Sequence, residues 1–183
     1  MRLAMVESRL CNSDDQHALR RFQCTEPGSP EYAMEVQRYI RDIDVRETPD
    51  WCTRMVLDIE GTSSILAFCE FGVVIETTPE QEGAYAISYI ARELSTRGRG
   101  LGSLMLEAAL RYMANDAASY DRTPYVMTQI APANTASIKL FSDHGFVNEG
   151  TDPDDPDYEI WSKEFTPEKT SRLRLYHSMV FND

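Results

Sequence analysis

The spacing of apolar residues changes several times along the chain, and each change marks the boundary of a predicted element. Alternating or continuous apolar runs predict strands, whereas apolar residues three and four positions apart predict amphipathic helices. The first pattern predicts strands at residues 1–10, 55–59, 64–75, 84–91, 124–130 and 158–165. The second predicts helices at residues 13–22, 30–44, 101–119 and 137–144. This order indicates an α+β fold with helices around one mixed sheet.

Local signals support several of these boundaries. Residues 13–15, Ser-Asp-Asp, offer N-caps for the first helix, and Pro30 fits the first turn of the second. Residues 60–62 lie between two β-rich runs and predict a hairpin turn. Gly145 fits the position just after the last helix.

The size and composition of the chain fit one globular domain. It has 183 residues, of which 42% are hydrophobic and 26% charged. We expect residues 1–165 to form this domain. Residues 166–183 are expected to be a C-terminal extension that packs on the domain or on a second subunit of a homodimer.

The charge of the chain is strongly acidic. The formal net charge is -12, with 30 acidic and 18 basic residues, which disfavours nucleic acid and anionic membrane surfaces as partners and favours a cationic one. No apolar run is long enough to span a membrane, and residues 1–12 lack the apolar centre of a signal peptide, so we expect a cytoplasmic protein. The four cysteines form no Cys-x-x-Cys pair and the three histidines are far apart, so neither a metal site nor a disulfide framework is expected.

A glycine-rich stretch lies between an expected strand and the longest expected helix. Its glycines let the backbone turn so that its amides point inward, beside helix amides that have no intrahelical partner. These amides, the helix dipole and two arginines favour phosphate binding; a flexible turn without a ligand is the alternative. The spacing is neither that of a Rossmann fingerprint nor that of a Walker A loop. The stretch consists of Arg97, Gly98, Arg99, Gly100, Leu101, Gly102 and Ser103.

The chain contains two motifs, one after the other, that resemble those of the GNAT superfamily of N-acetyltransferases. The first is the acyl-coenzyme A motif Arg/Gln-x-x-Gly-x-Gly/Ala, and the second is a strand, an Asn and a helix with aromatic-x-x-x-Gly-Phe. The matching residues are Arg97, Gly100 and Gly102, then Asn134, Phe141, Gly145 and Phe146. The match is strongest over residues 85–147. It implies the GNAT fold, a mixed and mostly antiparallel sheet that is splayed between the two motif strands and flanked by about four helices.

The resemblance also implies that acetyl-CoA is the co-substrate. Backbone amides of residues 98–103 would hold its pyrophosphate, and the backbone of Ile90, Ala91 and Arg92 would pair with the pantetheine arm as an added strand does. A backbone N–H of the same three residues would stabilise the oxyanion of the reaction. Asn134 would hydrogen-bond to the coenzyme, and a helix N-cap role for this residue is compatible with that contact.

Transfer to an amine requires a group that accepts the amine proton, and many family members use a carboxylate, often through water. Glu70 is the first candidate because it lies in an otherwise apolar strand. The alternative is that Glu70 faces solvent by simple alternation. Tyr89 and Glu93 are further candidates near the next strand, whereas Ser88 is too weak a base.

One position departs from the family pattern. The aromatic residue four positions before Gly145 is commonly a tyrosine that protonates the departing thiolate, and here it is Phe141. The thiolate of a thiol with a pKa of about 8.5 is a tolerable leaving group, so the missing phenol lowers the rate without preventing transfer. Ser142 or His144 could relay a proton through water, although each residue type is more often a surface residue of a short helix.

The sequence therefore predicts an enzyme that moves an acetyl group from acetyl-CoA directly to a primary amine. The acidic excess favours a cationic small molecule or a protein amine as acceptor. One alternative is a GNAT-type toxin that acetylates aminoacyl-tRNA, which Phe141 and the acidic charge disfavour. Another is a catalytically weak protein that binds acyl-CoA or a partner.

An acidic stretch near the C-terminus leaves several roles open. Residues 152–157 carry four aspartates and two prolines. Such a stretch could bind calcium, but the prolines favour a solvated loop. It could also form one rim of the acceptor site.

Overall fold

The computed structural model describes residues 2–62, 64–74 and 83–181. Met1 and Ile75, the expected ends of two strands, lie outside these ranges. The strands are β1 (Arg2–Leu10), β2 (Cys52–Ile59), β3 (Ile65–Val73), β4 (Tyr85–Arg92), β5 (Tyr125–Ile130), β6 (Val147–Thr151), β7 (Glu159–Glu164) and β8 (Tyr176–Phe181). The α-helices are α1 (Gln16–Arg20), α2 (Glu31–Asp42), α3 (Leu101–Tyr120) and α4 (Thr135–Asp143), and short 3-10 turns are η1 (Ser13–Asp15), η2 (Val45–Glu47) and η3 (Leu94–Thr96).

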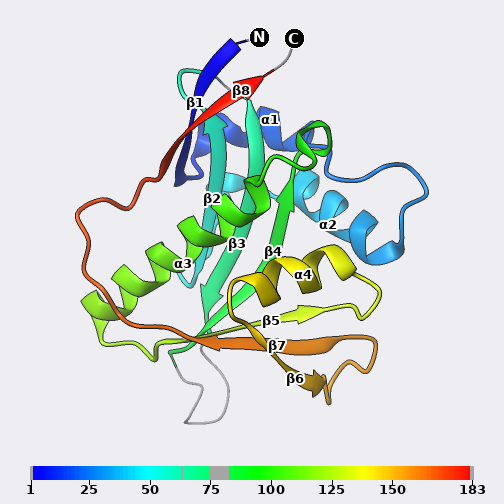
Figure 1. Cartoon of the computed structure of the whole chain (residues 1–183), viewed down its shortest axis with the longest axis vertical. Coiled ribbons are helices and arrows are strands. Elements are labelled where there is room, and N and C mark those ends of the chain that lie inside the picture. Colours follow the sequence, from blue (N-terminus) through cyan, green and yellow to red (C-terminus); the bar gives the residue numbers. More distant parts are fainter. Residues whose placement is uncertain (1, 63, 75–82, 182–183) are drawn as a thin grey trace.

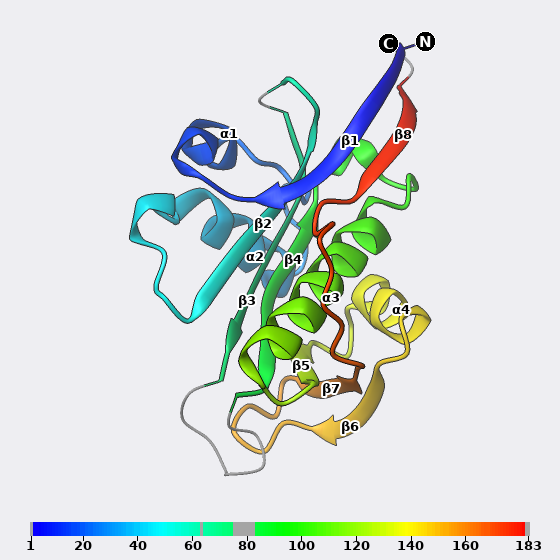
Figure 2. The ribbon, with the colours of Figure 1, turned by 90° about the vertical axis from the view of Figure 1, so that its left-hand side faces the viewer.

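The described strands form one eight-stranded sheet in the order β6-β7-β5-β4-β3-β2-β1-β8 (Figure 1). Neighbouring strands are antiparallel except β4 and β5, which are parallel. Helices α1 and α2 cover one face of the sheet, and α3 and α4 cover the other (Figure 2). The expected α+β fold, with a mixed and mostly antiparallel sheet and about four helices, is confirmed. Within the described ranges, no helix combines the length and apolar character needed to cross a membrane.

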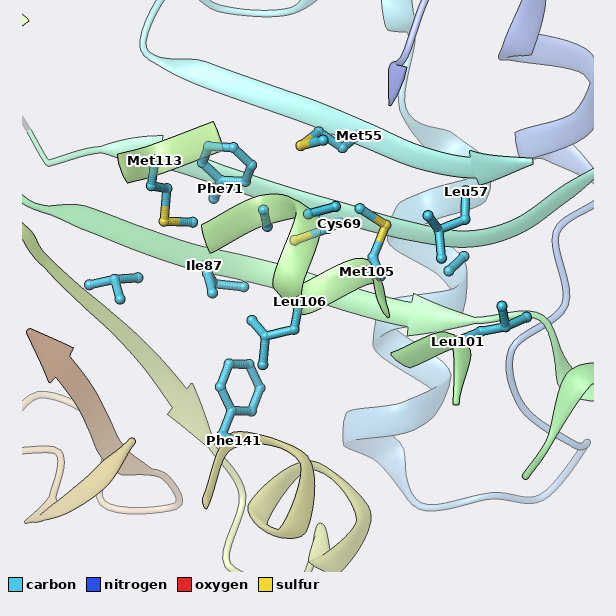
Figure 3. Packing of buried hydrophobic residues seen from close by; sticks show 14 of the residues in the cluster. Met55, Leu57, Cys69, Phe71, Ile87, Leu101, Met105, Leu106, Met113 and Phe141 are labelled. Atoms are coloured by element: carbon cyan, nitrogen blue, oxygen red, sulfur yellow. The ribbon is translucent and has the colours of Figure 1, made fainter. Parts of the chain in front are cut away.

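Strands β2 and β3 are buried on both faces, because an apolar cluster lies on each face of the sheet. On one side, Met55, Cys69 and Phe71 pack against α3 (Figure 3). On the other, Val56 and Phe68 pack against residues of α1 and α2. This burial explains why residues 64–75 read as a continuous apolar run rather than an alternating one.

The structure corrects several expected boundaries. The first helix is divided into η1, whose N-cap is Asn12, and α1, whose N-cap is Asp15, one of the three expected residues, although without a side-chain cap hydrogen bond. The last helix begins earlier than expected, at Thr135, while Gly145 follows it with the expected positive φ of 79°.

Strands β6 and β8 were not predicted from the sequence. Every residue of β6 is exposed, so this edge strand has no apolar alternation that a sequence pattern could show. Strand β8 forms by pairing with β1 at the other edge of the sheet, where Arg2 lies opposite Phe181 (Figure 1). Residues 176–181 therefore pair with the first strand of the same chain.

The packing of α3 on the sheet generates a prediction for stability. Leu106 is fully buried and lies between the sheet and Phe141 (Figure 3). We expect Leu106→Ala to lower the free energy of unfolding by about 2–5 kcal/mol, through lost burial and the cavity left behind. Ser119→Ala, at an exposed position of the same helix, should change it by less than about 0.5 kcal/mol. Urea denaturation of both variants measures the difference, and equal stabilities would contradict this packing.

Candidate functional site

The parallel pairing of β4 and β5 stops after three residue pairs. The last pair is Ile87 with Thr128, where the Thr128 hydroxyl donates a hydrogen bond of 2.9 Å to the Ile87 carbonyl. On its other side, β4 stays paired with β3 as far as Arg92. The register of that ladder shifts at Ser88, which lies in a bulge. Beyond Ile87, the edge of β4 that faces β5 is therefore not closed by β5 in the described structure.

A cavity of about 500 Å³ lies where the two strands separate. Its walls come from β4, β5, α2, α4 and the segment after β6. The charged residues among its lining, within the described parts of the chain, are Glu35 and Asp152, and both are acidic. Polar and aromatic lining residues include Tyr32, Ser88, Tyr89, Thr128, Gln129, Asn134, Phe141 and Tyr158.

The glycine-rich stretch forms the turn that leads from η3 into α3. Gly98 and Gly100 have φ values of 78° and 74°, which only glycine adopts without strain, and Gly100 is the N-cap of α3. The first intrahelical bond runs from the Leu104 N–H to the Gly100 carbonyl over 3.0 Å, so the amides of residues 101–103 precede the helical ladder. Gly102 lies 3.7 Å from Leu140 of α4, measured from the position its Cβ would occupy. These features suit a polyphosphate.

The two arginines of this stretch differ in their surroundings. Arg97 is exposed and lies directly after η3. The Arg99 guanidinium donates a hydrogen bond of 3.4 Å to the Val180 carbonyl of β8. The C-terminal strand therefore contacts the glycine-rich turn.

The residues of the second motif lie at the start of α4, near its end and directly after it. Asn134 is the N-cap, and its side-chain oxygen accepts a hydrogen bond of 3.1 Å from the Ser137 N–H. Phe141 is buried, lines the cavity, and packs edge-on against Phe146 with 4.9 Å between ring centroids. The side chain at this position carries no phenol, so it supplies neither a proton nor a hydrogen bond.

Glu70 is buried, with 4% of its surface exposed, so the alternative that it faces solvent is wrong. The Tyr39 hydroxyl lies 2.7 Å from each oxygen of its carboxylate, and the Arg54 guanidinium donates to Oε2 over 2.7 Å. The Tyr39 ring stacks on Tyr89 with 3.9 Å between centroids. Glu70 itself does not line the cavity, and its path to the cavity runs through these two rings.

The other candidate bases have different surroundings. Burial and the charge of Glu35 raise the pKa of Tyr89, so its phenol stays protonated at neutral pH and acts as a hydrogen-bond donor. Glu93 is the N-cap of η3 and accepts a hydrogen bond of 2.9 Å from the Ser95 N–H. Of the two, only Tyr89 lines the cavity, within the part of the chain that the structure describes.

Several lining residues were not singled out from the sequence. Glu35 and Tyr32 come from α2, and the Tyr32 hydroxyl donates to the Ala133 carbonyl over 3.4 Å, which ties α2 to the loop before α4. Nothing in the apolar spacing of α2 shows which of its polar residues face a cavity.

Asp152 was noted only as part of an acidic stretch. It is 5% exposed and accepts hydrogen bonds from the Gln129 side chain and from the Asp154 N–H, which lower the pKa of its carboxyl. It thus stays ionised at a wall of the cavity. Among the described residues, no group of three or more His, Cys, Asp or Glu side chains is arranged to hold a metal ion.

The chain is similar to a known protein family over most of its length. Residues 8–147 match the family model described as an acetyltransferase (GNAT) domain. No curated protein sequence matches the chain.

Many solved structures share the fold. The ribosomal-protein-S18-alanine N-acetyltransferase from Escherichia coli is 14% identical with a TM-score of 0.61, and the match covers 91% of this chain and 97% of that one. The PaiA N-acetyltransferase from Thermoplasma acidophilum, in complex with coenzyme A, is 14% identical with a TM-score of 0.65, covering 90% and 100%. A mutant AtaT toxin, bound to the C-terminus of the antitoxin AtaR and to acetyl-CoA, is 14% identical with a TM-score of 0.64, covering 86% and 92%. At such identities the likeness establishes the fold and leaves the acceptor open.

The buried ion pair beside the cavity generates a prediction. Glu70→Ala would leave the Arg54 guanidinium, which is 8% exposed, without its carboxylate, so we expect a loss of about 3–5 kcal/mol in the free energy of unfolding. The double variant Glu70→Leu with Arg54→Met should lose much less, because both charges are removed together. Glu31→Ala, which breaks an exposed ion pair with Arg38, should cost less than about 1 kcal/mol. Chemical denaturation ranks the three proteins, and a near-neutral Glu70→Ala would refute the tight pairing.

Proposed function

The chain belongs to the acetyltransferase (GNAT) domain family, and on this premise we propose that it transfers an acetyl group from acetyl-CoA to the primary amine of a cationic acceptor. The observation that carries the proposal is the cavity between β4 and β5. One side of it is an open strand edge that leads to a glycine turn suited to a polyphosphate. The charged residues of its walls, Glu35 and Asp152, are both acidic within the described chain.

The residues around the turn and the open edge fit the coenzyme. Amides of Gly98 to Ser103, with Arg97 and Arg99 nearby, would hold the pyrophosphate at the positive end of α3. Backbone groups of Ile90, Ala91 and Arg92 would pair with the pantetheine arm and donate to the thioester oxygen. Asn134 would add a hydrogen bond near the same arm. The coenzyme supplies an activated acetyl group that an amine can take up directly.

The opposite part of the cavity would take the acceptor. Glu35 and Asp152 carry negative charge there, and Tyr32, Tyr89 and Tyr158 present aromatic rings. Carboxylates and aromatic faces together bind ammonium groups, through ion pairing and cation–π attraction. This chemistry favours an amine that is positively charged before it reacts.

Proton movements follow from the same residues. The ammonium group of the acceptor loses one proton to become a nucleophile and a second proton as the amide forms. The departing thiolate takes up one proton, and the other is released to solvent. We assign Glu70 a positioning role, because Tyr39 and Arg54 already occupy its carboxylate and it meets the cavity only through the stacked ring of Tyr89. Glu35, whose carboxylate lines the cavity, is better placed to accept an amine proton, directly or through water. Asp152 also lines the cavity, but the hydrogen bonds that lower the pKa of its carboxyl make it a weaker base. The thiolate gains its proton from solvent, since Phe141 has none to give.

The toxin alternative has less support. A toxin shares the fold at 14% identity, but the acidic charge of this chain disfavours binding of tRNA. Retention of tRNA by the protein at low salt would favour that alternative.

We also expect the activity in a reducing cytoplasm, because Cys11, Cys24, Cys52 and Cys69 are all unpaired thiols.

Two glycines with the same backbone conformation test the coenzyme site. Gly100 and Gly61 both have φ of 74°, and neither would place a Cβ against another atom. Gly100→Trp fills the turn before α3, so we expect acetyl-CoA affinity to fall by at least about tenfold in calorimetry. Gly61→Trp, in the hairpin between β2 and β3, imposes similar backbone strain and should keep the affinity. Equal affinities of the two variants would remove this site assignment.

Turnover is measured separately as release of free thiol from acetyl-CoA with a panel of amines. Binding of the coenzyme without thiol release from any amine would instead support the catalytically weak alternative.

A charge variant tests the acceptor site. Glu35→Gln removes one of the negative charges that line the cavity. We expect the KM for a cationic amine to rise about fivefold, which corresponds to the loss of roughly 1 kcal/mol from a partly exposed ion pair. Glu31→Gln, on the same helix but paired with Arg38 outside the cavity, should leave KM unchanged. Steady-state kinetics with acetyl-CoA at saturation distinguishes them, and an unchanged KM in Glu35→Gln would argue against this acceptor wall.

A further inference from the structure

Ser103 and His144 form a side-chain pair between the first turn of α3 and the end of α4. The Ser103 Oγ lies 3.0 Å from His144 Nε2, and His144 Nδ1 lies 2.8 Å from the Leu140 carbonyl oxygen. The His144 side chain is only 13% exposed, so both contacts are shielded from water. The pair connects the turn proposed to hold the pyrophosphate to the second motif helix.

The Leu140 contact fixes the tautomer of the neutral imidazole. A carbonyl oxygen only accepts, so Nδ1 carries the hydrogen and Nε2 is left as an acceptor. The Ser103 hydroxyl then donates its single hydrogen to Nε2. In this state Ser103 has no hydrogen to offer to another group.

The position of Ser103 makes that hydrogen important. Ser103 is the third residue of α3, and the Cα–Cβ bond of a helical residue tilts toward the helix N-terminus. Its hydroxyl therefore lies on the side of the amides of residues 101–103. A phosphate oxygen at these amides would be repelled by the lone pairs of Oγ but bound by the hydroxyl hydrogen.

We infer that binding of the coenzyme A pyrophosphate at this turn is coupled to uptake of one proton by His144. Protonation places a hydrogen on Nε2, which then donates to Ser103 Oγ and releases the hydroxyl hydrogen for a phosphate oxygen. The proton comes from solvent, and the N–H bond is the only covalent bond that forms. His144 is thus a positioning residue that acts through Ser103. The inference rests on the proposed function, because it requires the coenzyme at this turn.

The charged groups around His144 act in both directions. Glu107 of α3 favours the imidazolium, with Oε1 3.8 Å from Nε2. Lys163 of β7 opposes it, because its ammonium donates to the His144 backbone carbonyl over 2.7 Å. Lys139 and Asp143 on α4 form an ion pair with each other, so their effects largely cancel. An incoming pyrophosphate adds negative charge and shifts the balance toward the imidazolium.

Calorimetry measures the coupling directly. Acetyl-CoA is titrated in buffers of different ionisation enthalpy between about pH 5.5 and 8.5, the range in which histidine side chains change charge. We expect the wild-type protein to take up more protons on binding than His144→Gln, by up to one per site. Subtracting the proton uptake of the variant from that of the wild type removes the contribution of the coenzyme's own 3′-phosphate, whose pKa is about 6. Affinity of the wild type should be highest at low pH and fall as pH rises, by at most about tenfold per pH unit.

Two further variants separate the coupling from a merely structural role. Ser103→Ala keeps His144 but loses the hydroxyl, so it should bind more weakly and show a smaller pH dependence than the wild type, because only the direct attraction between the imidazolium and the pyrophosphate remains. His177→Gln, at an exposed position of β8, should keep the wild-type behaviour. If Ser103→Ala retains the wild-type pH dependence, or if wild type and His144→Gln take up the same number of protons, the inference is wrong.

Nuclear magnetic resonance on the wild-type protein avoids any effect of mutation on folding. The chain has three histidines, so the His144 ring nitrogens can be assigned by comparison with His144→Gln. At a pH where the free protein shows neutral His144, addition of acetyl-CoA should move both ring nitrogens to the protonated shift. An unchanged ring with coenzyme bound would overturn the coupling while leaving the proposed function intact. Failure of acetyl-CoA to bind at any pH would overturn both.

Discussion

The early end of the ladder between β4 and β5 is the constraint on which the rest of the site depends. Parallel strands normally continue side by side, but here the pairing ends at Ile87 and Thr128. The Thr128 hydroxyl holds the last pair together, and the bulge at Ser88 turns β4 away while its other edge stays bonded to β3. One strand edge is thereby left open inside a sheet rather than at its border. Open backbone groups, the cavity, and Asn134 and Phe141 of the second motif all meet at this point.

An open strand edge requires rigid support. The burial of β2 and β3 on both faces of the sheet provides this support. Strand β3 packs against α3 on one face and against α1 and α2 on the other. On the face covered by α1 and α2, the Arg54–Glu70 ion pair and the Tyr39 hydroxyl bind one another within an apolar layer. Because Tyr39 stacks on Tyr89, this group fixes a ring that lines the cavity. These contacts support the positioning role proposed for Glu70.

The acidic charge of the chain and the binding of a polyphosphate are compatible because they concern different ends of the site. The proposed phosphate site consists of backbone amides with Arg97 and Arg99 at the start of α3. The acidic residues Glu35 and Asp152 lie at the cavity, on α2 and after β6. In the proposed function, the acidic charge therefore bears on the acceptor more than on the coenzyme. The Ser103–His144 contact lies at the proposed phosphate end of the site.

The sequence by itself determined the order and type of most elements, the glycine turn, the N-cap at Asn134 and the absence of a phenol at Phe141. These features are local: apolar spacing, a positive φ and a motif each involve neighbouring residues. Only the tertiary structure decided that Glu70 is ion-paired, that Glu35 and Asp152 share a cavity, and that His144 meets Ser103. Likewise β8 exists because β1 offers an edge, and the exposed residues of β6 carry no pattern of their own. Such contacts join residues far apart in the chain, and no periodicity within one segment records which distant side chain it will meet.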